Sequence, residues 1–105
     1  MEKRYYVYIL ANHKNGTLYI GITSNIIKRI WEHKDKAVKG FTSRYGVDKL
    51  VYLEEFSDPE NAIRREKRLK KYSRQWKLNL IERQNSNWDD LYENFVSGLP
   101  EQVGQ

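Results

Sequence analysis

Five side chains in this sequence can bind and protonate or deprotonate a charged substrate: Tyr8, Tyr19, Arg29, His33 and Glu66. An arginine neutralises anionic oxygens, and a histidine changes its charge near neutral pH. A carboxylate is the side chain with which proteins hold hard divalent cations. Each of the five also has an ordinary structural explanation, so their value as a set depends on the elements that position them.

The first two belong to a predicted hairpin. Residues 5–11 and 17–22 have the β-branched and aromatic composition of strands, and the turn 12–16 ends on Asn-Gly. Pairing the aliphatic faces of the strands fixes the register and brings Tyr8 and Tyr19 to the same side. Gly21 beside them leaves backbone room for a ligand. The alternative is that both tyrosines are strand residues packed under a helix.

A helix is predicted from Ile26 to about Lys36, after the capping side chains of residues 23–25. Ile26 and Ile30 form its apolar stripe, and Arg29 and His33 share one face because they are four residues apart. An arginine and a histidine in this position can meet a phosphate at the sheet edge. The alternative is a solvated flank of a charged helix.

Glu66 lies in the apolar stripe of a predicted helix from Glu60 to about Tyr72, among Ala62, Ile63 and Leu69. A carboxylate in that position is costly to desolvate unless a cation accompanies it. Either a basic neighbour on the same helix pairs with it, or it binds a metal ion in a partly open site. The pattern leaves both interpretations open.

The basic residues favour a polyanionic partner. The net charge is +5, and basic side chains run nearly round the helix of Glu66, so they cannot all face one groove. Phosphates of a nucleic acid are the obvious counter-charge, although a solvated face is the plain alternative. The candidate nucleic-acid-binding residues are Lys28, Arg44, Arg65, Lys70, Lys71, Arg74 and Lys77.

The order of elements predicts an α+β fold with a small three-stranded antiparallel sheet flanked by helices, in the order β-β-α-β-α-α. The third strand is 49–56, a helix runs from Gln75 to about Gln84, and residues 88–96 form a last short helix. Residues 39–46 are expected as a loop, residues 1–96 as one domain and 97–105 as a flexible tail. Without cysteine or a long apolar run, the chain is expected in the cytoplasm and not in a membrane. A monomer is the default expectation.

With these residues placed, the sequence resembles the GIY-YIG nucleases. The resemblance rests on Tyr6-Val7-Tyr8, Tyr19-Ile20-Gly21, then Arg29, His33 and Glu66 in order. It extends over nearly the whole chain, through Phe41 to Tyr45, the segment 65–77, and Asn87-Trp88. The sequence is most similar to small stand-alone bacterial members related to the N-terminal cutting domain of the excision-repair nuclease.

The resemblance implies a metal-dependent endonuclease that hydrolyses phosphodiester bonds in DNA, with weak sequence or structure selectivity and a link to DNA repair. Glu66 would hold one Mg²⁺ or Mn²⁺ ion, and Arg29 would offset charge on the phosphorane-like transition state. Tyr8, with Tyr19 and His33 around it, would orient or deprotonate the attacking water. A tyrosine needs its pKa lowered to act as a base, whereas His33 titrates more easily, and the sequence does not decide between them.

Three positions depart from the family pattern. Tyr6 replaces the first glycine, Ile22 and Thr23 stand where some members have a lysine, and a late asparagine is matched only by Lys77 or the off-register Asn79. The rival hypothesis is a non-catalytic nucleic-acid-binding module on the same scaffold. A third is a basic accessory protein whose tyrosines and Glu66 are structural.

Overall fold

The structure, a computed structural model, describes residues 3–36 and 40–97. It contains three strands and five helices within these ranges. In chain order they are β1 (Tyr5–Ala11), β2 (Leu18–Thr23), α1 (Ile26–Lys34), α2 (Phe41–Tyr45), β3 (Lys49–Phe56), α3 (Pro59–Lys71), α4 (Arg74–Gln84) and α5 (Tyr92–Ser97).

The three strands form one antiparallel sheet in the order β2-β1-β3, which confirms the predicted fold class. In the hairpin, Val7 is opposite Ile22 and Ile9 is opposite Ile20, so the aliphatic faces coincide as predicted. Asn15 in the turn adopts a φ of 61°, the left-handed conformation expected of the Asn-Gly pair. β1 pairs with β3 on its other side, with an irregularity between Ile9 and Leu10.

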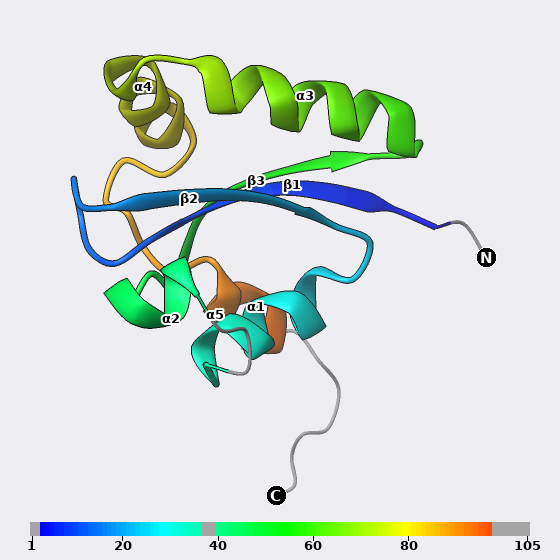
Figure 1. The fold of residues 1–105 in the computed structure, drawn as a ribbon. Coiled ribbons are helices and arrows are strands. Elements are labelled where there is room, and N and C mark those ends of the chain that lie inside the picture. The colour runs from blue at the N-terminus through cyan, green and yellow to red at the C-terminus, as the bar shows by residue number, and fades with distance from the viewer. Residues whose placement is uncertain (1–2, 37–39, 98–105) are drawn as a thin grey trace, which may run out of the picture.

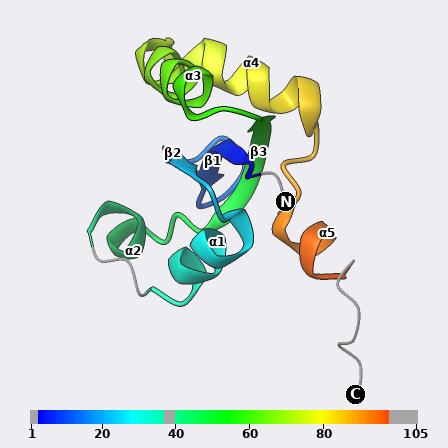
Figure 2. The same cartoon turned by 90° about the vertical axis from the view of Figure 1, so that its right-hand side faces the viewer.

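Helices cover both faces of the sheet (Figure 1). α3 and α4 lie on one face, and α1, α2 and α5 lie on the other, as the turned view also shows (Figure 2). Each face therefore has its own hydrophobic core. Val7 and Ile9 pack with Leu69 and Ile81 on the first face. Tyr8 and Leu10 pack with Ile26 and Ile30 on the second. Because the central strand is buried on both faces, it cannot shift register without losing both cores.

Side chains at the C-terminal end of α4 occupy the outer edge of β3. Gln84 mimics a neighbouring strand, because its amide accepts from the Leu53 N–H (3.1 Å) and donates to the Leu53 carbonyl (3.0 Å). The buried Asn85 donates to the carbonyl of Val51 (3.1 Å). β2 forms the opposite edge of the sheet. Within residues 3–36 and 40–97, no other segment hydrogen-bonds to the outer backbone of β2.

Some predicted boundaries were wrong. α1 ends at Lys34, before Lys36, because Lys36 has a φ of 59° that closes the helix. The expected loop 39–46 contains the short helix α2, bracketed by Gly40 and Gly46, both at positive φ. Its remaining residue, 39, lies outside the described residues.

The last helix spans Tyr92–Ser97 and not 88–96. Trp88 is buried at a φ of 58°, and the Asp90 carboxylate accepts from the backbone N–H of Tyr92, where the helix begins. Ser97, expected in the tail, is therefore helical, and 98–105 lie outside the described residues. Ile63 was predicted in the buried stripe of α3 but is 43% exposed, because Ala62 and Leu69 form the contact with the sheet.

Replacing Asn85 tests how far the closed edge of β3 stabilises the fold. Besides Val51, its side chain donates to the Asp89 carbonyl (2.8 Å) and accepts from the Asp89 N–H (3.1 Å). Asn85→Ala removes the partner of the buried Val51 carbonyl and of the part-buried Asp89 backbone groups, and it is expected to lower the free energy of unfolding by about 1–3 kcal/mol in urea titrations. Asn79→Ala, an exposed control bonded only to Gln75 in the described part of the chain, should change it by less than about 0.5 kcal/mol. Equal effects of the two substitutions would contradict this role.

Candidate functional site

Gly21 has no side chain, and this leaves room for the Tyr8 ring against the backbone of β2. Tyr8 is paired with Gly21 across the hairpin, and a Cβ atom added to Gly21 would overlap the Tyr8 ring and hydroxyl. The space beside Gly21, expected to admit a ligand, is therefore filled by Tyr8. Because both faces of β1 are buried, the Tyr8 residue is 1% exposed.

A buried hydrogen-bonded chain starts at the Tyr8 hydroxyl. The hydroxyl lies 3.2 Å from Nε2 of His33 on α1. Nδ1 of the same imidazole lies 3.0 Å from Oγ1 of Thr42 on α2. His33 is 2% exposed and Thr42 is 4% exposed. The imidazole therefore forms its hydrogen bonds with protein groups and not with solvent. His33 thus lies on the side of α1 that faces the sheet. The interpretation of this residue as part of a solvated flank is wrong.

Tyr19 and Arg29 complete the cluster. The Tyr19 ring lies 6.4 Å from that of Tyr8 and 5.6 Å from that of His33, measured between centroids. The predicted approach of the two tyrosines is therefore confirmed as geometry. Arg29 borders Tyr8, and its guanidinium pairs with Glu32 one turn later (3.3 Å). The structure thus brings together four of the five residues singled out in the sequence.

The environment fixes the charge states of this cluster. Burial raises the pKa of Tyr8 to about 12, although the neighbouring Arg29 guanidinium opposes that shift. Burial, followed by the positive charge of Arg29, lowers the pKa of His33 from its usual value of 6.5. At neutral pH the cluster therefore holds a neutral phenol and a neutral imidazole beside one arginine.

Two shallow hollows lie along β2, the strand with the unpaired outer edge. One, of about 320 Å³, is lined by residues of the β2–α1 connection together with Lys28, Arg29 and Glu32. The other, of about 330 Å³, is lined by Leu18, Tyr19, Ile20, Phe41, Lys70 and Lys77. The second hollow joins Tyr19 from the cluster to lysines from α3 and α4. Positive charge therefore flanks both ends of this edge.

Glu66 lies on α3, on the other face of the sheet from Tyr8 and His33. Its side chain is 13% exposed and forms an ion pair with Lys70, 2.5 Å away. The structure thus contains the basic partner that one interpretation of the sequence required. Lys70 also lines the hollow beside Tyr19, which places Glu66 next to that hollow through its partner.

The donor set around Glu66 suits only a weakly coordinated ion. Within residues 3–36 and 40–97, no group of three or more acidic or histidine side chains lies close enough together to hold a metal. Mg²⁺ commonly keeps several waters and takes one or two carboxylates together with substrate phosphates. A single carboxylate fits that mode of binding, provided that Lys70 releases it.

The candidate nucleic-acid-binding residues lie in different surroundings. Lys28, Lys70 and Lys77 line the hollows along β2, whereas Arg44 and Lys71 are exposed, Arg44 over the ring of Tyr45. Arg74 instead donates to the carbonyls of Asn15 and Gly16 and so holds the hairpin turn. Three of the seven predicted residues therefore line the hollows along β2.

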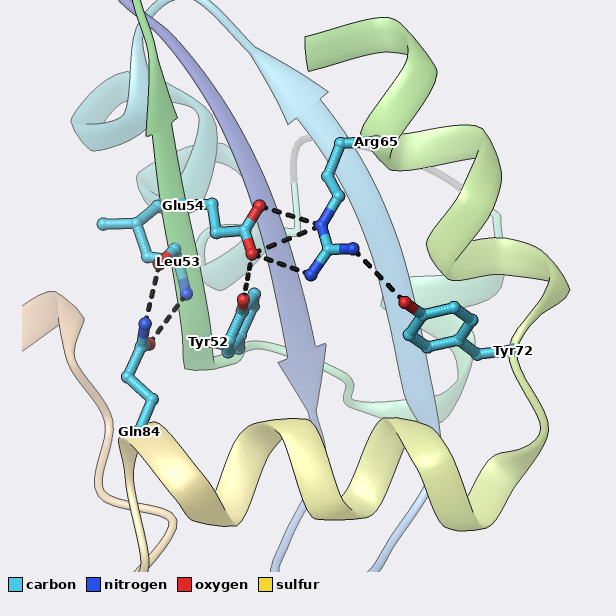
Figure 3. Close-up of polar contacts among 6 residues, drawn as sticks. All are labelled: Tyr52, Leu53, Glu54, Arg65, Tyr72 and Gln84. Carbon is cyan, nitrogen blue, oxygen red and sulfur yellow. Dashed lines mark hydrogen bonds and ion pairs between the residues drawn. The ribbon is translucent and has the colours of Figure 1, made fainter. Parts of the chain in front are cut away.

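Arg65 belongs to a network on the opposite side of α3 (Figure 3). Its guanidinium donates to both carboxylate oxygens of Glu54 on β3 and to the hydroxyl of Tyr72, and Glu54 also accepts from Tyr52. These hydrogen bonds raise the pKa of Arg65. Its charge is balanced by Glu54 in a contact that joins α3 to β3, so its predicted contact with nucleic acid would compete with this ion pair.

The sequence analysis missed Thr42 and Glu32, which contact His33 and Arg29. Thr42 lies in a five-residue helix too short to show a period, and nine residues separate it from His33. Glu32 was treated as part of a charged helix surface. Its position three residues after Arg29 is the one signal that could have identified it.

Comparisons with known proteins identify the family of the chain. Residues 4–79 match the model of the GIY-YIG catalytic domain. A UPF0213 protein from Staphylococcus haemolyticus is 40% identical over 79 residues, which cover 75% of this chain and 95% of the relative. A UPF0213 protein from Clostridium perfringens is 43% identical over 76 residues, 72% of this chain and 81% of the relative.

The solution NMR structure of a UPF0213 protein from Bacillus halodurans is similar as well. It has a TM-score of 0.53 and 31% sequence identity, and the match covers 83% of this chain and 92% of that one. The chain therefore belongs to the GIY-YIG family, a family of nucleases, and its relatives include UPF0213 proteins. Among the described residues, no helix combines the length and apolar character needed to span a bilayer.

The contact between Gly21 and Tyr8 can be tested by a double-mutant cycle. Gly21→Ala forces the Tyr8 ring away and is expected to lower the free energy of unfolding by about 1–3 kcal/mol, measured in urea. In a Tyr8→Ala background the same substitution should cost much less, because the ring that it meets is gone. The same cost in both backgrounds would show that Gly21 is needed for another reason.

The lowered pKa of His33 predicts a pH dependence of stability. As the pH falls through about 6.5, His33 becomes protonated in the unfolded chain but stays neutral in the folded chain, because its pKa is lowered there. The folded state therefore loses stability relative to the unfolded state. The midpoint of thermal unfolding should therefore fall between pH 7.5 and pH 5.5, and His33→Gln should flatten that fall. His13→Gln, at the exposed turn, is the matched control and should keep the wild-type slope. A slope unchanged by His33→Gln would contradict the assignment.

Proposed function

We propose that this protein is a divalent-metal-dependent endonuclease that hydrolyses phosphodiester bonds in DNA. The observation that carries the proposal is the buried contact of Tyr8 with His33, next to Arg29 and beside the open edge of β2. Phosphodiester hydrolysis needs a group to take a proton from water and a cation to offset negative charge on the phosphoryl oxygens. Both kinds of group meet at this edge, in a chain that belongs to a nuclease family.

Each side chain has a role under this proposal. Arg29 faces the phosphoryl oxygens, on which negative charge increases in the transition state. Tyr8, supported by His33 and flanked by Tyr19, orients and deprotonates the attacking water. Glu66 would hold one Mg²⁺ or Mn²⁺ ion, which would polarise the phosphate. Lys70 neutralises Glu66 before the ion binds and is then free to contact the backbone of the substrate.

The charge distribution supports a nucleic-acid backbone as the ligand. Lys28 and the lysines of α3 and α4 lie along the strand that Tyr19 belongs to, and such cations bind phosphates without reading bases. We therefore propose weak sequence selectivity or selectivity for DNA structure. A cytoplasmic monomer with a role in DNA repair completes the proposal.

A non-catalytic nucleic-acid-binding module is the second candidate. The ion pair of Glu66 with Lys70 favours it, because a carboxylate neutralised within its own helix can have a purely structural role. In that case the basic edge would bind DNA, and Tyr8 and His33 would only fill the space between α1 and the sheet.

A nicking assay separates the two candidates. Supercoiled plasmid and branched DNA are incubated with Mg²⁺, Mn²⁺ or EDTA, and wild type is compared with Glu66→Gln. Metal-dependent cleavage should fall by at least about 100-fold in the variant while DNA binding is kept. Glu60→Gln, in the exposed first turn of the same helix, is the control and should cut like wild type. Binding without cleavage of any substrate would favour the non-catalytic module.

Arg29 and Lys28 form a matched pair for the role of charge. Arg29→Ala should reduce single-turnover cleavage at saturating DNA by about 10²- to 10³-fold, because its interaction strengthens as charge increases on the phosphate. Lys28→Ala, on the neighbouring position of the same hollow, should weaken binding and flatten its salt dependence instead. Similar cleavage by wild type and the Arg29 variant would remove Arg29 from the proposed mechanism.

A further inference from the structure

The chain of Tyr8, His33 and Thr42 has a direction that its neighbours determine. Two hydrogen bonds join the three groups, and the neutral chain carries three protons, one on each hydroxyl and one on the imidazole. Either Tyr8 donates toward His33 and Thr42 accepts, or Thr42 donates toward His33 and Tyr8 accepts. The two arrangements place the imidazole proton on different nitrogens and give His33 opposite roles.

Arg29 selects the first arrangement. A guanidinium can only donate, and that of Arg29 borders the Tyr8 hydroxyl. With the phenol oxygen available as an acceptor for that guanidinium, the phenol proton is best placed toward Nε2 of His33, 3.2 Å away. Nε2 is the ring nitrogen that faces the Tyr8 hydroxyl, and Arg29 lies close enough for its positive charge to lower the pKa of the imidazole.

Thr42 is well placed to receive the remaining imidazole proton. In the described part of the chain, His33 is the hydrogen-bond partner of its hydroxyl, 3.0 Å from Nδ1. The residue itself is fixed, because its backbone carbonyl accepts from the N–H groups of Gly46 and Val47 at the end of α2. The hydroxyl is thus held against the imidazole by the helix and not by a flexible loop.

We propose that Thr42 is a positioning residue, whose hydroxyl accepts from Nδ1–H of His33 and so keeps Nε2 available to take the proton of Tyr8. This inference rests on the proposed nuclease function. In the proton transfer, the O–H bond of Tyr8 breaks and an N–H bond forms at Nε2, giving a phenolate and an imidazolium with no change in net charge. The phenolate then takes a proton from the attacking water, and His33 returns its proton to solvent.

The tautomer of His33 can be read directly by ¹⁵N NMR of histidine-labelled protein, without any nuclease assay. The protonated and unprotonated ring nitrogens of a neutral imidazole have well-separated shifts, and His13→Gln identifies the signals of His33. In wild type we expect Nδ1 of His33 to carry the proton. Thr42→Val removes the acceptor at nearly constant volume and should shift the population toward Nε2–H, whereas Thr42→Ser should restore the wild-type pattern.

Cleavage provides the second measurement. Thr42→Val should lower kcat by about 10- to 100-fold with little change in KM, and Thr42→Ser should recover most of that loss. A proton on Nε2 of His33 in wild type, or an unchanged tautomer in Thr42→Val, would overturn the inference. If Thr42→Val fails to fold, the wild-type spectrum alone tests the inference. If no substrate is cut, the proposed function fails while the tautomer measurement still tests the role of Thr42.

Discussion

The packing of the Tyr8 ring against the bare backbone of Gly21 is the contact on which the candidate site depends. It allows a large polar side chain on the central strand to lie flat between β2 and α1, with its hydroxyl toward His33. His33 in turn requires Thr42, and Thr42 requires α2 to be held between two glycines at positive φ. The lack of a side chain at Gly21 in β2 therefore determines the positions of groups on β1, α1 and α2.

The two edges of the sheet have different uses. At β3, the side chains of Gln84 and Asn85 complete the hydrogen bonding of the strand, and Arg65 joins α3 to Glu54 at the same side (Figure 3). At β2, the described residues supply no such cover, and lysines approach from both layers of helices. The basic residues of α3 divide accordingly: Arg65 stabilises the closed edge, and Lys70 faces the open one. A charged helix can thus bind a ligand on one side and stabilise the fold on the other.

The sequence predicts the fold and the tyrosine pair well, because a period of two residues determines which face each strand residue occupies. Val7 and Ile9 must meet Ile20 and Ile22, and Tyr8 and Tyr19 follow on the other face. Prediction fails where no period exists, as in the five residues of α2, or where partners come from distant elements. Nothing in the sequence around Arg65 indicates that Glu54, eleven residues earlier on a strand, binds its guanidinium. Ile63 is exposed because Ala62 and Leu69 form the contact of α3 with the sheet. The buried face of α3 is therefore narrower than the apolar pattern of its sequence predicts.

Under the proposed function, Glu66 on one face of the sheet and the tyrosine cluster on the other act at the same phosphate across the edge of β2. Paramagnetic broadening by Mn²⁺ in ¹H–¹⁵N spectra tests it most directly, with a short DNA duplex bound through cleavage-resistant phosphorothioate linkages. The account predicts the strongest broadening at the amides of Glu66 and of Tyr19 to Gly21, and its loss in Glu66→Gln. Broadening that centres elsewhere, or that persists at these amides in the variant, would contradict it.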